Sequence, residues 1–171
     1  MFIMVNETAR ININNILERA IDIGQRMLVT GAEVGRVERT INFICRAYGV
    51  RHVDVMVITT SIIVTLRGND IGVLTQMRRV PGQNFDFQRL KALNQLSREI
   101  CANPMSSDEI KVRIHAIDTM ETISLKASLF YWALIAGSFS AFFGGRLEDA
   151  ICAGIVGVLL RLLQYLLGQT K

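Results

Sequence analysis

Apolar residues in the first part of the chain recur at steps of three and four, the spacing of one buried face of an amphipathic helix. Two such stripes follow one another, and a break at Thr30 separates them. The second stripe stops at Gly49, where glycine can adopt the left-handed conformation that ends a helix. The stripes comprise Ile13, Ile16, Leu17, Ala20, Gly24, Met27 and Leu28, and then Val34, Val37, Ile41, Ile44 and Tyr48.

Three short segments rich in valine, isoleucine and threonine follow these stripes and predict strands. They cover residues 53–58, 62–66 and 71–80. The sequence Arg67-Gly68-Asn69-Asp70 is typical of a turn between the last two strands, and Pro81-Gly82 ends the third.

Two further helical stripes follow the strands, and a Ser106-x-x-Glu109 capping box behind Pro104 marks the start of the second. The resulting order, ααβββαα, predicts an α+β domain over residues 1–123, with its helices on one face of a small antiparallel sheet. The stripes are Phe87, Leu90, Leu93, Leu96 and Ile100, and then Ile110, Ile114 and Ile117.

The remaining residues, 124–171, predict a membrane segment with two spans, at 126–145 and 147–167. Residues 127–145 form an uncharged run of 19 residues, which as a helix would extend ~28 Å, against ~30 Å of bilayer hydrocarbon. The second run carries Arg161. The alternative is a pair of buried core helices, but a front domain of this size could hardly enclose two of them.

Charge divides the chain in the same way. Hydrophobic residues make up 50% of it and the net charge is +4, yet the charges after Lys126 are few: Arg146, Glu148, Asp149, Arg161 and Lys171. The N-terminus lacks the features of a signal peptide, so we expect a cytoplasmic front domain and a location in the inner membrane. Lys126, where the chain enters the membrane, agrees with the positive-inside tendency. Basic residues alternate with acidic ones, which disfavours nucleic acid as a partner.

Candidate enzymatic and metal sites are weak. His52 and Asp54 lie two apart on a predicted strand and share a face, so a nucleophile–base arrangement with nearby hydroxyls is conceivable. His115 and Asp118 share a helical face, but two ligands without a third are a poor metal site. Phosphate-binding and dinucleotide fingerprints are missing from the sequence. We therefore predict neither an enzyme nor a bound metal or cofactor.

Three cysteines occur, Cys45, Cys101 and Cys152, without a CxxC or Cys/His spacing. An odd number of cysteines suits a reducing compartment and a packing role.

The stretch TGAEVGRVERTI, from Thr30 to Ile41, can be explained by local structure alone. Thr30 stands as an N-cap with Glu33 three residues on, which predicts a capping box at the start of the second helix. Gly31 and Gly35 are four apart and would then share a face that another backbone can approach.

The complete string resembles the threonine/serine exporter family. The resemblance rests on GAEVGRVERTI after GQRML, on Tyr48-Gly49, Ile58-Thr59-Thr60 and Arg78-Arg79-Val80, and on FGGRLEDAICAGIVG, which contains Gly144, Gly145 and Asp149. It implies a cytoplasmic domain attached to a multi-span exporter of small amino acids or, in split two-subunit members, of dicarboxylates. It also implies a gating or binding role for the motif residues Gly31, Glu33, Arg36 and Glu38.

The family has more spans than the two predicted here. Two helices do not enclose a polar pathway, so we expect the chain to be part of an exporter that needs further spans or a partner membrane subunit. Small residues at Gly137-x-x-x-Ala141 and Ala150-x-x-x-Gly154 predict close helix contacts and an oligomer. The alternative function is a membrane-tethered cytoplasmic binding or regulatory domain whose spans serve only as an anchor.

Two charged residues of the membrane segment are candidates for the transport path. Arg161 lies ~16 Å along a helix that starts at Ala150, near mid-depth, and could hold a substrate carboxylate. It could equally extend to the cytoplasmic surface from a shorter span. Asp149 would lie at the external mouth, either coupled to protons or as a solvated loop carboxylate.

Overall fold

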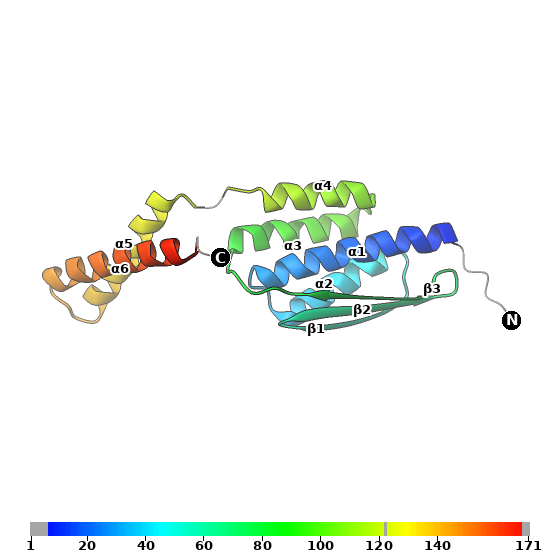
Figure 1. The fold of residues 1–171 in the computed structure, drawn as a ribbon, viewed down its shortest axis with the longest axis horizontal. Coiled ribbons are helices and arrows are strands. Elements are labelled where there is room, and N and C mark those ends of the chain that lie inside the picture. The colour runs from blue at the N-terminus through cyan, green and yellow to red at the C-terminus, as the bar shows by residue number, and fades with distance from the viewer. Residues whose placement is uncertain (1–6, 122, 169–171) are drawn as a thin grey trace. The chain divides into compact units, whose positions relative to one another are not determined.

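The computed structural model describes residues 7–121 and 123–168. They form two compact units, Met1–Met120 and Glu121–Lys171, which we call the front unit and the hairpin unit (Figure 1). The prediction placed this division at residue 123. Each unit has its own secondary structure and is described by itself.

The front unit contains four helices and three strands in its described part. Its sheet has the order β1-β2-β3, and both pairs are antiparallel, with Val64 opposite Val55 on one side and Gln76 on the other. Helices α1 and α2 cover one face of the sheet, and α3 and α4 pack beyond them (Figure 1). In chain order the elements are α1 Glu7–Val29, α2 Val34–Ala47, β1 His52–Ile58, β2 Ser61–Gly68, β3 Gly72–Arg79, α3 Phe87–Ala102 and α4 Ser107–Asp118.

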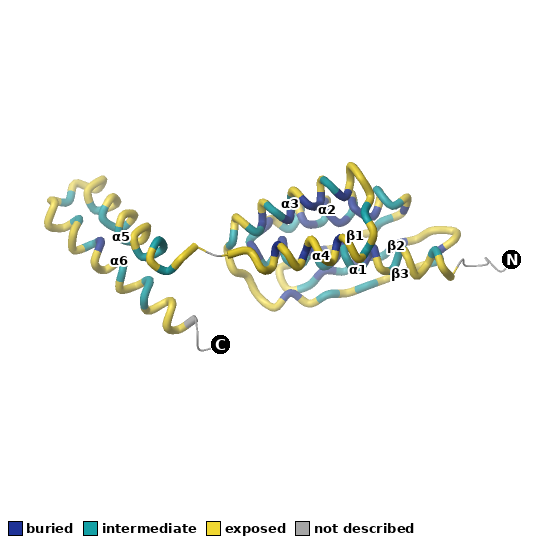
Figure 2. The backbone as a smooth tube through the Cα atoms, turned by 90° about the horizontal axis from the view of Figure 1, so that it is seen from above, coloured by how far each residue is buried: buried dark blue, intermediate teal, exposed yellow. Residues whose placement is uncertain are grey.

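The core of the front unit lies between the sheet and the helices (Figure 2). Alternate β2 residues Ile62, Val64 and Leu66 are buried against the helical stripes, as the period of two along a strand requires. The opposite face of the sheet is exposed and carries Met56 and Met77. The helical stripes predicted from the sequence supply most of the remaining core side chains, among them Leu17, Ile21, Met27, Leu28, Ile41, Ile44, Leu93, Ile100 and Ile110.

The junction between α1 and α2 differs from the predicted capping box. Gly31 has a positive φ of 98° and follows α1, and the amides of Gly31 and Ala32 donate to the carbonyls of Leu28 and Met27. This is a Schellman motif, which ends α1. The Thr30 hydroxyl donates back to the Arg26 and Met27 carbonyls, so it caps no helix N-terminus.

The predicted shared face of Gly31 and Gly35 is therefore wrong, because Gly31 lies outside both helices. Gly49 has φ 85° and ends α2 by the same motif, as the sequence predicted. At α4 the predicted cap is confirmed: the Ser106 hydroxyl accepts from the Glu109 amide.

The hairpin unit consists of α5, Leu125–Phe142, and α6, Leu147–Gly168, joined by a short turn. Gly144, with φ 87°, ends α5, so the first helix is shorter than the predicted span 126–145. Both helices are long and apolar enough to cross a membrane.

Small residues bring the two backbones of the hairpin together. The Cβ position of Gly137 lies 3.1 Å from the Ala150 carbonyl oxygen, and that of Gly157 lies 2.7 Å from the Trp132 carbonyl oxygen. A larger side chain at Gly157 would therefore force the helices apart, which is the close approach that small residues allow between membrane helices.

Candidate functional site

The motif residues around Gly31 form a structural junction. The ring of Phe85 covers Gly31, with its Cδ1 atom 2.6 Å from where a Cβ would stand. The amides of Asn84 and Asp86 donate to the Val29 and Thr30 carbonyls at 2.6 and 3.2 Å. The loop before α3 thus satisfies carbonyls at the end of α1 that have no partner inside the helix. Gly31 serves this packing, because both its φ and the ring exclude a side chain.

Glu33 is exposed and occupies the N-cap position of α2. Its side chain makes no capping hydrogen bond to the described residues, so the predicted exchange with Thr30 does not occur. A carboxylate at this end of a helix still interacts favourably with the helix dipole.

Glu38 connects α2 to the edge strand β1. Its Oε1 accepts from the Val57 amide at 3.0 Å, and Asn42 Nδ2 donates to the Val53 carbonyl at 3.3 Å. These side chains satisfy backbone groups that face away from β2, and this protects a sheet edge from pairing with another chain.

Arg36 is exposed on the α2 surface that faces α3 and lines a groove between the two helices. Gly31, Glu33, Arg36 and Glu38 therefore have four different surroundings and do not converge on one site. Arg36 and Glu38 are two residues apart on α2 and therefore do not share a face, while Gly31 and Glu33 precede the helix.

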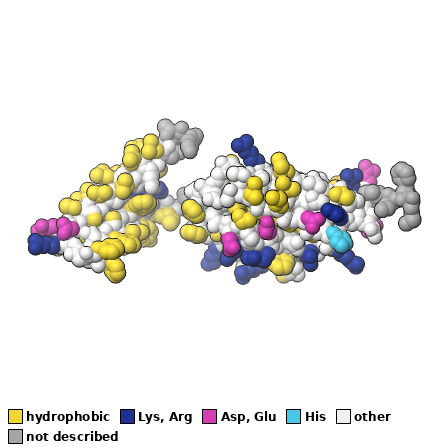
Figure 3. All heavy atoms as spheres, turned by 90° about the horizontal axis from the view of Figure 1, so that it is seen from below, with side chains coloured by type: hydrophobic (Ala, Val, Ile, Leu, Met, Phe, Trp, Pro, Cys, Tyr) yellow, Lys and Arg dark blue, Asp and Glu magenta, His cyan; other side chains and the backbone are white. Residues whose placement is uncertain are grey.

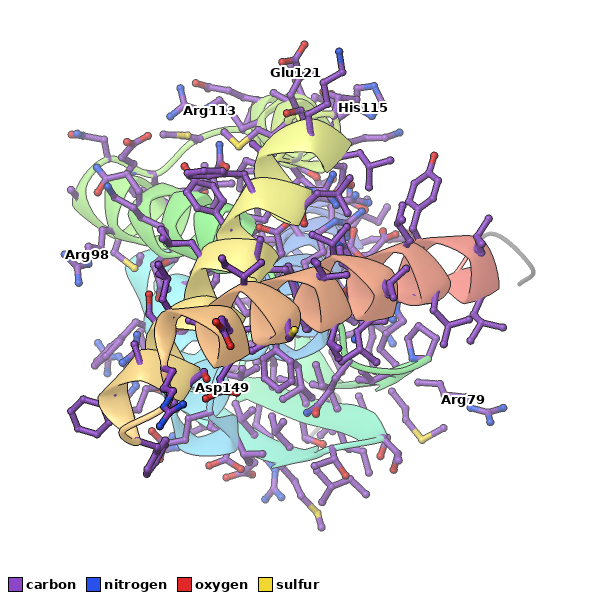
Figure 4. The ribbon with its side chains drawn as sticks, turned by 90° about the vertical axis from the view of Figure 1, so that its left-hand side faces the viewer. Arg79, Arg98, Arg113, His115, Glu121 and Asp149 are labelled. Atoms are coloured by element: carbon purple, nitrogen blue, oxygen red, sulfur yellow. The ribbon has the colours of Figure 1, made fainter. Side chains whose placement is uncertain are left out.

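The candidate catalytic and metal-binding carboxylates are each paired with an arginine. Asp54 lies 3.4 Å from Arg67 on the exposed face of the sheet, where His52 is also exposed. Asp118 accepts two-pronged hydrogen bonds from Arg26 at 2.9 to 3.0 Å, while the exposed His115 lies on the same helix (Figure 4). Within the described residues no group of three or more metal-ligating side chains occurs.

The cysteines differ in exposure. Cys45 is buried, and burial raises the pKa of its thiol to about 12, so it stays protonated and packs in the core. Cys101 and Cys152 are exposed, although partial desolvation of the Cys101 thiol still raises its pKa above the ordinary value.

Arg161 on α6 reaches across the hairpin to α5. Its Nε donates to Ser128 Oγ at 2.7 Å, and Ser128 lies in the first turn of α5. Arg161 is ~21 Å along α6 from Leu147, about two thirds of the helix. Because α6 begins at Leu147, three residues before Ala150, Arg161 lies farther from the α5–α6 turn than the estimate from Ala150 suggested. Sequence reasoning missed Ser128, since nothing in the pattern specifies how the two helices are aligned.

Asp149 lies in the first turn of α6, at the turn end of the hairpin (Figure 4). Its Oδ2 accepts from the Arg146 amide at 2.8 Å, which satisfies a free donor at the helix start. Asp149 and Arg161 are twelve residues apart on one helix, ~18 Å, so no single small substrate group contacts both.

Basic residues missed by the sequence reasoning share the groove of Arg36. Arg39 and Arg46 line it from α2 and Arg98 from α3. The spacing of the α2 arginines on one helix face was visible in the sequence, but their approach to Arg98 depends on how α2 packs on α3.

The comparisons with known proteins gave one match. The family model of the threonine/serine exporters, ThrE, matches residues 18–171, which include most of the front unit and the hairpin unit. A search of curated proteins and a search of solved structures each returned no match. The family is one of transporters, not enzymes, and it implies a membrane location and a small-molecule substrate. With a family match over most of its length and two helices able to cross a membrane, the chain belongs to the threonine/serine exporter family.

Proposed function

We propose that the chain is part of an inner-membrane exporter of small amino acids, threonine and serine foremost, with α5 and α6 as two of its spans. The observation that carries this proposal is the family match, which continues through both units. The apolar surface of the hairpin supports it (Figure 3): none of the described side chains of α5 is buried, which suits helices surrounded by lipid or by other spans.

We place the front unit in the cytoplasm. Lys126 stands at the start of α5, next to the front unit in the chain, and positive charge near the end of a span favours the cytoplasmic side. Asp149 and Glu148, at the α5–α6 turn, would then lie on the outer side. Substrate released there would pass a carboxylate-bearing mouth.

A transport path must be lined by more helices than the two of the hairpin. Two helices packed through Gly137, Gly154 and Gly157 leave no room for a route between them, so a polar path needs further helices. We propose that these come from additional spans, from a partner membrane subunit or from other copies of the chain. The same architecture would serve dicarboxylates, the alternative substrate class.

Arg161 is the residue we propose to hold the substrate. One of its N–H groups donates to Ser128, and its guanidinium forms no ion pair with the described residues. The outer nitrogens remain available for a two-pronged contact with a carboxylate. Amino acids and dicarboxylates both carry a carboxylate, so this role does not depend on which class is exported.

Efflux from cells tests the proposal. Bacteria that express the chain with its neighbouring genes are loaded with labelled threonine, serine or succinate, and efflux is followed against vector-only cells. Efflux of threonine or serine is the expected result. Efflux of succinate alone would identify dicarboxylates as the substrate class. If none of the three leaves faster than in vector-only cells, the export proposal is contradicted.

Arg161 variants sharpen this assay. Arg161→Leu should abolish export without impairing membrane insertion, and Arg161→Lys should restore it only in part, because an ammonium cannot form the forked contact. Arg146→Leu, the same change at the α5–α6 turn, is the matched control and should retain export. Full export by both Arg161 variants would show that Arg161 only extends to the membrane surface.

The second candidate, a membrane-tethered binding domain, is favoured by the basic groove of the front unit. It predicts that replacing α5 and α6 by an unrelated apolar hairpin preserves function. Loss of function in that chimaera, with the front unit still folded, would favour export.

A further inference from the structure

The groove between α2 and α3 in the front unit is lined by several arginines. It has a volume of about 650 Å³, within the ~300–1,000 Å³ typical of small-molecule sites. Its rim carries Arg36, Arg39, Arg46 and Arg98, and a continuation along α3 adds Lys91. No acidic side chain is among the described residues that line it. Figure 3 shows basic side chains gathered along one long edge of this unit.

The arginines of the groove have no ion-pair partner in the part of the chain that the structure describes. Elsewhere in the front unit Arg26 pairs with Asp118 and Arg113 with Glu99, but the four groove arginines form no ion pair with any described residue. Four like charges around one hollow repel each other. An anionic ligand would relieve this repulsion.

Two carboxylates on the helices that form the groove are bonded to other elements. Glu38 accepts from the Val57 amide on β1, and Glu99 is paired with Arg113 of α4. Both acids belong to the helices that form the groove, yet each is bonded to a different element, β1 or α4. These two acids therefore form no ion pair with the groove arginines.

The floor of the groove carries polar groups that already form hydrogen bonds within the protein. The Thr40 and Ser97 hydroxyls are buried and donate to the Arg36 and Asn94 carbonyls of their own helices. The free hydrogen-bond donors are thus the guanidinium groups at the rim, whose forked geometry suits phosphate and carboxylate oxygens.

The length of the groove indicates the kind of anion. Arg36 and Arg46 are ten residues apart, ~15 Å along α2, so one inorganic ion cannot contact both. Between them Phe43 is 60% exposed and lines the groove. An exposed aromatic face beside cationic groups suits a ligand that combines charged groups with a flat apolar part, since nucleobases stack on aromatic side chains.

We propose that this groove binds a phosphate-bearing organic anion with the dimensions of a nucleoside triphosphate. The guanidinium groups contact the phosphates, and Phe43 contacts the organic part. The residues that line the site all belong to the front unit, and the site would give this unit a ligand of its own, whichever solute the membrane part exports.

Binding of ATP to the full chain in a neutral detergent, without Mg²⁺, tests the proposal. Wild-type chain should bind ATP, and adenosine should bind at least tenfold more weakly. The double variant Arg36→Gln/Arg98→Gln should lose tenfold or more in ATP affinity, because hydrogen bonds to charged groups contribute strongly. Arg79→Gln, an exposed arginine outside the groove, is the control and should change affinity less than twofold.

A second measurement covers the case in which the double variant fails to fold. Cys101 lines the groove and is exposed, so in a Cys152→Ser chain ATP should slow its alkylation several-fold, while adenosine should not. Unchanged alkylation with saturating ATP, or equal ATP affinity in the groove variant and wild type, would overturn the proposal. So would adenosine binding as tightly as ATP.

Phosphate can also come from a lipid headgroup, and a competition separates the two sources. Micelles doped with phosphatidylglycerol are compared with micelles doped with phosphatidylcholine. Displacement of ATP by phosphatidylglycerol alone would identify an anionic headgroup as the occupant of the groove. Unchanged ATP binding in both would identify a free anion.

Discussion

In the front unit most of the large aliphatic side chains of α1 lie inside, whereas in the hairpin unit most of the large side chains of α5 and α6 face outward. Leu17 and Ile21 are fully buried, while Phe139 and Leu159 are 60% and 59% exposed. Burying a side chain of this size stabilises a fold by ~1.5–3 kcal/mol. The front unit obtains that stabilisation within itself, and the hairpin unit requires a lipid or protein environment. Each of the following predictions tests this contrast.

The largest expected effect concerns whether the front unit folds without the hairpin unit. Residues 1–120 should express as a soluble folded unit, because their helices and sheet bury a continuous core without the hairpin. Size-exclusion chromatography and circular dichroism would check this. The matched piece, residues 121–171, should require detergent. Recovery of residues 1–120 only as aggregates, while the full chain folds in detergent, would contradict the independence of the front unit.

The second prediction is that shortening a leucine side chain affects stability in the front unit but not in the hairpin unit. Leu17→Ala removes a fully buried side chain and should lower the free energy of unfolding of the front unit by about 2–5 kcal/mol. Leu163→Ala, the same change on the exposed surface of α6, should leave that free energy unchanged. Urea unfolding of the full chain in detergent, followed by circular dichroism, measures both. Equal losses would mean that the front unit depends on the hairpin.

The hairpin has its own sensitive position at Gly157. Gly157→Leu places a side chain where the Trp132 carbonyl is 2.7 Å from the Cβ position. We expect overpacking to cost about 1–3 kcal/mol and to separate the helices. Trp132 is the single tryptophan of the chain, so its fluorescence reports on the hairpin alone. An unchanged emission spectrum in Gly157→Leu, with normal insertion, would mean that the helices do not pack through this glycine.

Gly31 provides a matched pair of variants, one of which should have almost no effect. Gly31→Ala introduces a Cβ at φ 98° and against the Phe85 ring, which should destabilise the front unit by about 1–3 kcal/mol. Gly35→Ala adds the same methyl group within α2, where the Cβ meets only ordinary contacts at 3.6 Å and beyond. It should be neutral or slightly stabilising. Thermal unfolding of the two variants side by side checks the difference. If Gly31→Ala is as stable as wild type but impaired in export, Gly31 has a transport role beyond the helix junction.

The elements were predictable because each leaves a periodic signature. The stripe through Leu17, Met27 and Leu28 and the alternation along 62–66 both record one buried face. The α1–α2 junction was not predictable in this way. Gly31 directly follows an apolar stripe and is therefore a helix-stop signal, like the one that correctly predicted the end of α2 at Gly49. Thr30 with Glu33 matched a capping box equally well. Two local motifs competed for the same residues, and the loop that places Phe85 on Gly31 decided between them.

By itself the sequence determined which segments are helices and strands, that two of them are apolar enough for a membrane, and which family the chain resembles. These properties depend on residue type and on spacing along one element. Tertiary structure decided the surroundings of the charged residues: Glu38 contacts β1 and Arg161 contacts Ser128, and the arginines of α2 share a groove with Arg98. Such contacts depend on the alignment of elements far apart in the chain, which packing of whole surfaces sets and local periodicity does not encode.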